Sequence, residues 1–189
     1  GDEKANYSES YRADGTVRDQ TEFVYDAGAV RATDSSVGAS STLVRQDTYR
    51  HDAAGARGTI QSKSYLKGNT GEEKSNVQIG YDSLGAAKTT TKFIYTGDAL
   101  TESYVMDSDQ YDAATTDKLK ATSKTVKSHS FYTGTEGEEQ VTRSHTYITG
   151  ITVTTAVPVP GVSNIRNTTL FTYSAVPADD KKMLSSAVY

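Results

Sequence analysis

Apolar and polar residues alternate along much of this sequence with a period of two residues. The pattern is longest between residues 141 and 159, where the even positions are mostly Thr, Ser, Gly and Pro. Successive side chains of a β-strand point to opposite faces of a sheet, so this alternation predicts a strand. A second example runs from Lys88 to Tyr95, where Phe93 and Tyr95 share one face. The odd positions of the longer segment include Val141, Tyr147, Ile151, Val153, Val157 and Val159.

Helical periodicity is almost missing from the sequence. One candidate helix covers residues 178–188, where Asp179 and Asp180 would suit a first turn, although Val188 and Tyr189 could equally close a strand. We therefore expect an all-β fold with little or no helix, made of antiparallel strand-turn repeats. The pattern leaves three arrangements open, namely one long sheet, a two-sheet sandwich or a solenoid-like body.

A short turn motif recurs at regular intervals. The segments that begin at His51, Tyr81 and Tyr111 read aromatic-Asp-x-x-Gly or a close variant, and they start 30 residues apart. In such a motif the Asp side chain accepts hydrogen bonds from backbone amides, and Gly takes the positive φ that closes the turn. The residues expected to form these turns are Tyr25, Asp26, Gly28, Asp52, Gly55, Tyr81, Asp82, Gly85, Tyr111 and Asp112.

Midway through each of these sequence repeats lies a second turn. It is followed by glutamate, at Glu72-Glu73, Glu102 and Glu138-Glu139. A glycosidase needs two carboxylates at a defined separation, one of them with a raised pKa. A catalytic pair usually occurs once, whereas these glutamates recur in every repeat. Their recurrence favours a surface role, in which they keep exposed strands soluble and discourage edge pairing.

The repeats divide the chain into three parts. Residues 1–24 form a polar N-terminal segment, which could be an edge strand or a strand exchanged between copies. Residues 25–147 form the β-repeat body. Residues 148–189 are more apolar and hold all three prolines, so we expect a C-terminal β segment that could pair with another subunit.

The Tyr-Asp-x-x-Gly units of residues 25–147 resemble the YD repeats of Rhs proteins, toxin-complex shells and teneurins. Those proteins are extracellular or secreted, and their repeats wind strands into a sheet or hollow shell. The resemblance implies a strand-turn repeat used for architecture outside the cell.

Composition narrows the function further. Only 35% of the residues are hydrophobic, a composition that suits sheets with one solvent-exposed face. The net charge is -4, and no basic cluster indicates nucleic-acid binding. The sequence has no cysteine, which excludes disulfides and thiol chemistry. No apolar run approaches the roughly 18 residues that a membrane-spanning helix needs.

Aspartate and histidine side chains are the metal-ligand types to consider in this sequence. Asp107, Asp109 and Asp112 could hold calcium, but the segment lacks the central Gly and terminal Glu of a helical calcium loop. The alternative is a solvated turn in which the Asp side chains cap backbone groups. The three histidines, His51, His129 and His145, have no metal-ligand spacing and are expected on strand faces. We expect no cofactor.

These observations predict a structural protein of the cell surface or extracellular space, without enzymatic activity. We expect it to be a subunit of a filament or layer, with copies of itself as partners, joined by β-strand addition. The residues expected to mediate assembly are Tyr147, Ile151, Val153, Val157 and Val159. The alternative is an adhesin or glycan-binding module from a larger YD-repeat surface protein.

Overall fold

The computed structural model describes residues 4–26, 29–116, 118–120, 124–153, 165–173 and 183–189, with the backbone alone at residues 124 and 149–153. These residues form strands and turns and contain no helix, so none of them could cross a membrane as a helix. The strands are β1 (Tyr7–Tyr11), β2 (Val17–Tyr25), β3 (Val30–Arg31), β4 (Leu43–His51), β5 (Arg57–Lys67), β6 (Lys74–Tyr81), β7 (Ala87–Thr96), β8 (Ala99–Asp107), β9 (Lys124–Thr133), β10 (Gln140–Val153), β11 (Ile165–Tyr173) and β12 (Met183–Val188).

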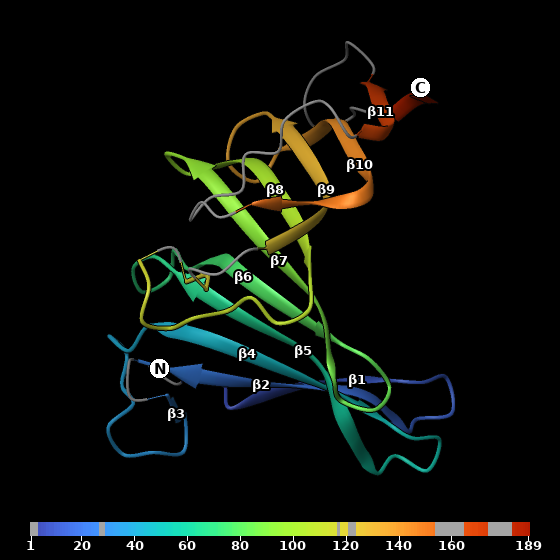
Figure 1. Ribbon diagram of the computed structural model, residues 1–189. Coiled ribbons are helices and arrows are strands. Elements are labelled where there is room, and N and C mark those ends of the chain that lie inside the picture. The colour runs from blue at the N-terminus through green and yellow to red at the C-terminus, as the bar shows by residue number, and fades with distance from the viewer. Residues whose placement is uncertain (1–3, 27–28, 117, 121–123, 154–164, 174–182) are drawn as a thin grey trace. The chain divides into compact units, whose positions relative to one another are not determined.

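The strands form one antiparallel meander, which is not closed into a barrel (Figure 1). Each strand pairs with the next one along the chain, apart from the short β3, which pairs with β2 beside the main series. The all-β prediction is confirmed, and of the three arrangements left open the chain adopts the meandering sheet. Short connections follow β1, β4, β5, β6, β7 and β9, and they suit this topology because antiparallel strands can be joined by tight hairpins.

The chain divides into two compact units, residues 1–89 and residues 90–189. The division falls inside β7 and therefore within the predicted repeat body of residues 25–147. Unit 1 contains β1 to β6, and unit 2 contains β8 to β12.

The Asp-x-x-Gly motifs form the hairpin turns that follow β4 and β6. In the first turn, Asp52 Oδ1 accepts hydrogen bonds from the amides of Ala54 and Ala56, both at 2.9 Å. Gly55 has a φ of 80°, which an L side chain rarely adopts. Asp82 makes the same two bonds in the second turn, to Leu84 and Ala86. The repeated motif thus produces a repeated turn.

A turn of the same backbone geometry joins β1 to β2, inside the polar N-terminal segment. The amide of Gly15 bonds to the carbonyl of Arg12 at 3.0 Å, as that of Gly55 bonds to Asp52 at 3.1 Å. Arg12 stands where the motif has Asp, and Asp14 Oδ1 caps the amide of Thr16 instead. The structural repeat therefore begins earlier than the sequence motif shows.

Both units have a thin core in which polar residues are buried beside apolar ones. Burying a large apolar side chain contributes about 1.5–3 kcal/mol to folding, so a small set of such residues carries much of the stability of each unit. The buried apolar residues are Val24, Tyr25, Val77 and Ile79 in unit 1, and Tyr104, Met106, Leu119, Val126 and Tyr147 in unit 2.

The last strand corrects the helix considered for residues 178–188. Residues 183–188 form β12, which pairs antiparallel with β11 from Thr169↔Val188 to Tyr173↔Met183. The remainder of that candidate helix lies outside the described residues. The apolar residues of β12 come as two adjacent pairs four positions apart, residues 183–184 and 187–188, and this spacing also fits a helix.

Candidate functional site

Each unit has one open sheet edge in the part of the chain that the structure describes. The strand order begins with β1 in unit 1 and ends with β12 in unit 2. An edge strand presents backbone N–H and C=O groups that can pair with another strand. These two edges are the candidate assembly site.

The hydrogen bonds to β11 determine which backbone groups of β12 point outward. Thr168 and Tyr189 exchange both of their backbone hydrogen bonds, at 3.0 and 2.9 Å. Bonded and non-bonded pairs alternate along an antiparallel ladder. Ala187 therefore faces β11, whereas the N–H and C=O groups of Ser186 and Val188 face away from it.

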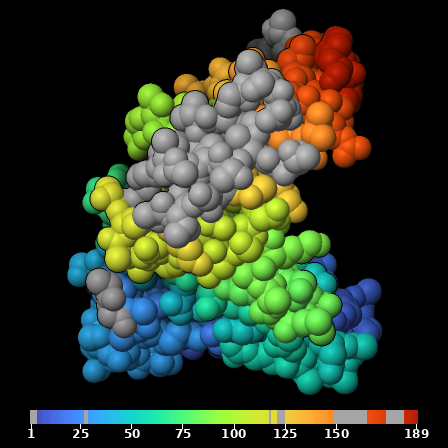
Figure 2. Space-filling model, viewed as in Figure 1, coloured from blue at the N-terminus to red at the C-terminus, as the bar shows by residue number. Residues whose placement is uncertain are grey.

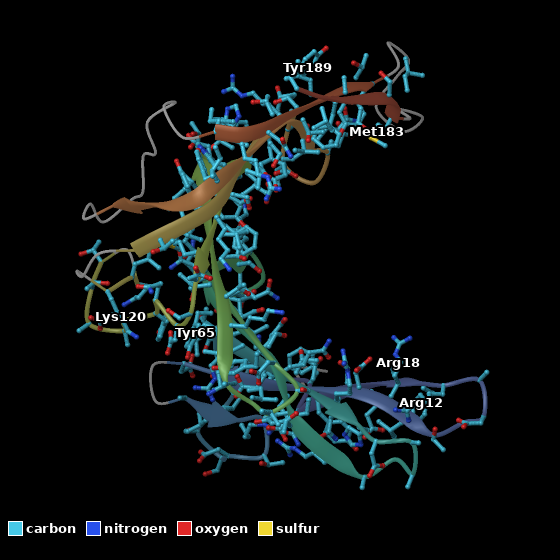
Figure 3. The ribbon with its side chains drawn as sticks, turned by 45° about the vertical axis from the view of Figure 1, so that its right-hand side comes forward. Arg12, Arg18, Tyr65, Lys120, Met183 and Tyr189 are labelled. Carbon is cyan, nitrogen blue, oxygen red and sulfur yellow. The ribbon has the colours of Figure 1, made fainter. Side chains whose placement is uncertain are left out.

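The large apolar side chains of β12, and Tyr189 after it, are exposed. Met183 is 56% exposed, Leu184 66%, Val188 63% and Tyr189 76%. No side chain of residues 183–189 is charged, so this edge lacks the charged side chains with which edge strands usually prevent pairing. Figure 2 shows the strand in red at the surface, and Figure 3 labels Met183 and Tyr189 at its two ends.

The β1 edge is more polar than the β12 edge. Tyr7 and Tyr11 are exposed, and the Tyr11 hydroxyl donates to Glu9 Oε2 at 2.7 Å. This hydrogen bond raises the pKa of Tyr11. The amide of Phe23 bonds to the carbonyl of Asn6, so the backbone groups of Tyr7 and Glu9 point away from β2 by the same alternation.

The residues predicted to mediate assembly lie elsewhere. Tyr147 is only 6% exposed and pairs with Ile165 of β11. Ile151 and Val153 pair through their backbones with β9 of the same chain. Val157 and Val159 lie outside the described residues. The sequence analysis did not predict that Met183, Leu184, Val188 and Tyr189 would be exposed together. The absence of charged side chains from residues 183–189 could have indicated an edge open to pairing.

The three aspartates considered for calcium have other partners. Asp107 pairs with Lys127 Nζ at 2.5 Å. Asp109 Oδ1 caps the amide of Tyr111 at 2.9 Å, and Asp112 Oδ1 caps that of Ala114 at 2.9 Å. No group of three or more His, Cys, Asp or Glu side chains that could hold a metal ion occurs among the described residues. The geometry matches the alternative of capped turns.

Two of the repeated glutamates join neighbouring strands. Glu73, in the turn after β5, accepts the amide of Leu43 at the start of β4 at 3.0 Å, and it also accepts the amide of Gly71. Glu139 makes equivalent bonds in unit 2, to Leu100 at the start of β8 and to Gly137. Desolvation opposes ionisation, but these backbone hydrogen bonds lower the pKa of Glu73 overall. The glutamates thus clamp a turn to the adjacent strand, a role that sequence reasoning missed.

A second polar cluster crosses three strands of unit 2. Glu102 Oε2 accepts hydrogen bonds from the hydroxyl of Tyr104 and from His129 Nε2, the latter at 2.8 Å. The His129 ring lies between Tyr104 and Phe131, with centroid distances of 4.1 and 3.9 Å. The guanidinium of Arg143, on β10, lies 4.1 Å from the centre of the Phe131 ring. The cluster therefore ties β8, β9 and β10 together.

Burial shifts the pKa of two members of this cluster, Tyr104 and His129. Desolvation, followed by the contact with Glu102, raises the pKa of Tyr104 far above its ordinary value. Desolvation lowers the pKa of His129 even though Glu102 acts in the opposite direction. The lowered pKa favours the neutral form of the ring, which matches a position on a packed strand face.

No protein-family model matches the sequence, and no curated protein matches it.

Proposed function

We propose that this chain is a structural protein of the cell surface or extracellular space, and that its copies assemble into a filament or layer by β-strand addition. The observation that carries the proposal is the β12 edge, which is uncharged, exposed on its side chains and unpaired on its outer side among the described residues. Backbone hydrogen bonds supply affinity in strand addition, and alternate side chains supply specificity.

The partner of β12 in this proposal is β1 of a second copy. Both strands end the strand series, and both direct backbone groups outward. Joining two different surfaces is a heterologous contact, which produces an open filament unless the rotation closes a ring. An extracellular location follows from the resemblance to YD repeats, whose proteins use such strands for architecture.

The proposal assigns no catalytic role to the chain. Its recurrent carboxylates, Glu73, Glu102 and Glu139, each accept hydrogen bonds from groups of the same unit. These bonds give the glutamates a structural use and support the architectural reading.

A proline at the outer edge of β12 tests the proposal. Ser186→Pro removes an N–H that faces away from β11, so the chain's own ladder keeps its hydrogen bonds. Ser186→Ala keeps the N–H and is the matched control. We expect filaments of the wild type and of Ser186→Ala in negative-stain electron microscopy, and dispersed particles of Ser186→Pro.

Filaments of Ser186→Pro would contradict strand addition at β12. Dispersed particles of the wild type would contradict the filament itself and favour the alternative, an adhesin or glycan-binding module of a larger YD-repeat protein. The exposed rings of Tyr7 and Tyr11 support that alternative, since aromatic faces can stack on sugars.

A further inference from the structure

A pocket of about 330 Å³ lies in unit 1, where β4 ends, β5 begins and the turn after β6 starts. Its volume is within the range of small-molecule sites, at the lower end. The pocket belongs to neither sheet edge, so it plays no part in the proposed assembly.

Irregular pairing between β4 and β5 produces the pocket. Thr48 pairs with Ser62, Tyr49 with Ile60, and His51 with Arg57, so β5 has extra residues at two positions. Gly58 permits close approach of the two strands, because a Cβ there would lie 2.8 Å from the carbonyl oxygen of Arg50. Such bulges redirect side chains and are frequent beside binding sites.

The charges of the lining favour a neutral ligand that carries hydroxyl groups. Arg50 contributes one positive charge, and Asp52 and Asp82 contribute two negative charges, which gives a formal net charge of -1. Both aspartates use Oδ1 to cap their turns, which leaves Oδ2 as an acceptor for a ligand hydroxyl. A net negative lining disfavours an anionic ligand.

His51 lines the pocket and also has a buried ring nitrogen without a partner. Its Nδ1 lies 2.9 Å from the carbonyl oxygen of Gly55, which can only accept, so Nδ1 carries the proton and Nε2 of the neutral ring is an acceptor. His51 is 7% exposed, and Nε2 is buried without a hydrogen-bond partner. A buried acceptor without a partner destabilises a fold, and any donor that reached Nε2 would relieve that cost.

Apolar and amide groups complete the lining. Ile60 and Tyr81 offer apolar surface, and Gln61 offers both a donor and an acceptor. A sugar combines an apolar C–H face with hydroxyls that donate and accept. From the bulge, the mixed lining and the unpaired His51 Nε2, we infer that this pocket binds one uncharged sugar residue.

Titrations followed by protein NMR test the inference. Methyl glucoside, methyl galactoside and N-acetylglucosamine are added to the ¹⁵N-labelled protein, with glucuronic acid as the acidic comparison. We expect at least one neutral sugar to shift the amide signals of residues 50–61 and 81–83, and glucuronic acid to bind more weakly. Gln61→Ala should weaken binding about tenfold, the effect of losing one good hydrogen bond.

Gln78→Ala is the matched control, because Gln78 lies on β6 away from the pocket and pairs with Ser64. It should bind the sugar as the wild type does, and the amide spectra of both variants show whether they are folded. The inference is overturned if no neutral sugar shifts the pocket signals, or if Gln61→Ala binds as tightly as Gln78→Ala. Asp82→Asn, which keeps an oxygen for the turn, should improve the binding of glucuronic acid.

Discussion

At the scale of single residues, this protein uses polar side chains to hold its backbone in place. Asp52 and Asp82 each satisfy two amides of their own turn. Glu102 accepts two hydrogen bonds from side chains on two strands. With only a thin apolar core, such bonds contribute a large share of the stability, at about 1 kcal/mol each.

His129 should make the stability of unit 2 depend on pH. Its folded pKa lies below its ordinary value of 6.5, because burial disfavours the charged ring. The unfolded chain then binds more protons than the folded chain as the pH falls below 6.5, so stability is full above that pH and decreases below it. Urea unfolding measured across this range should show the loss.

The groups that face His129 are Glu102 and Tyr104 from β8, and Arg143 and His145 from β10. His145 also has a lowered pKa, caused by desolvation and then by Arg143, and contributes in the same direction. His129→Phe keeps an aromatic ring in the stack and should flatten the pH dependence, with His145 responsible for the remainder. An unchanged pH profile in His129→Phe would show that the effect originates elsewhere.

At the scale of elements, the chain alternates two kinds of turn. The Asp-x-x-Gly turns follow β4 and β6, and the glutamate-clamped turns follow β5 and β9. In a meander, successive turns lie at opposite ends of the strands. From β4 to β7, two aspartate-capped turns therefore lie at one end of the strands and the turn clamped by Glu73 lies at the other.

Removing one clamp tests its contribution. Glu73→Ala should destabilise unit 1 by about 1–2 kcal/mol, because the amides of Leu43 and Gly71 lose their acceptor. The amide of Leu43 should also exchange its hydrogen faster. Glu72→Ala, at the exposed neighbouring position, is the control and should change stability by less than about 0.5 kcal/mol. Equal effects of the two substitutions would show that the clamp contributes nothing measurable.

At the scale of the whole molecule, an open meander with two different edges explains how copies could join without a globular interface. The exposed apolar strand β12 and the more polar β1 differ in composition, so pairing between them is heterologous. A heterologous contact leaves one free edge at each end of a growing filament. A copy that can pair at one edge only should therefore stop the growth of a filament once it has joined its end.

Mixing experiments follow from this geometry. Ser186→Pro blocks the β12 edge and leaves β1 open, so a small fraction of this variant should cap filaments of the wild type and shorten them. The double variant Glu9→Pro with Ser186→Pro also blocks an outward N–H of β1 and should leave filament length unchanged. Filament lengths in electron micrographs provide the measurement. Equal shortening by both variants would contradict pairing between β12 and β1.

The sequence by itself determined the local structure. Alternation from Lys88 to Tyr95 corresponds to β7, Ala87–Thr96, and the Asp-x-x-Gly motifs correspond to the turns capped by Asp52 and Asp82. Strands and tight turns depend on side-chain period and on bonds between residues only two to four positions apart. Such information is present in a short stretch of sequence.

The tertiary structure alone decided which of these elements meet and which remain exposed. Glu73 reaches Leu43 from 30 positions along the chain, and His129 reaches Glu102 from 27, because neighbouring strands bring them together. Tyr147 and Val188 are both apolar residues of strands, yet one is buried and the other is exposed. The reason is that burial depends on whether a strand lies inside the series or at its end, which is a property of the pairing order and not of either residue.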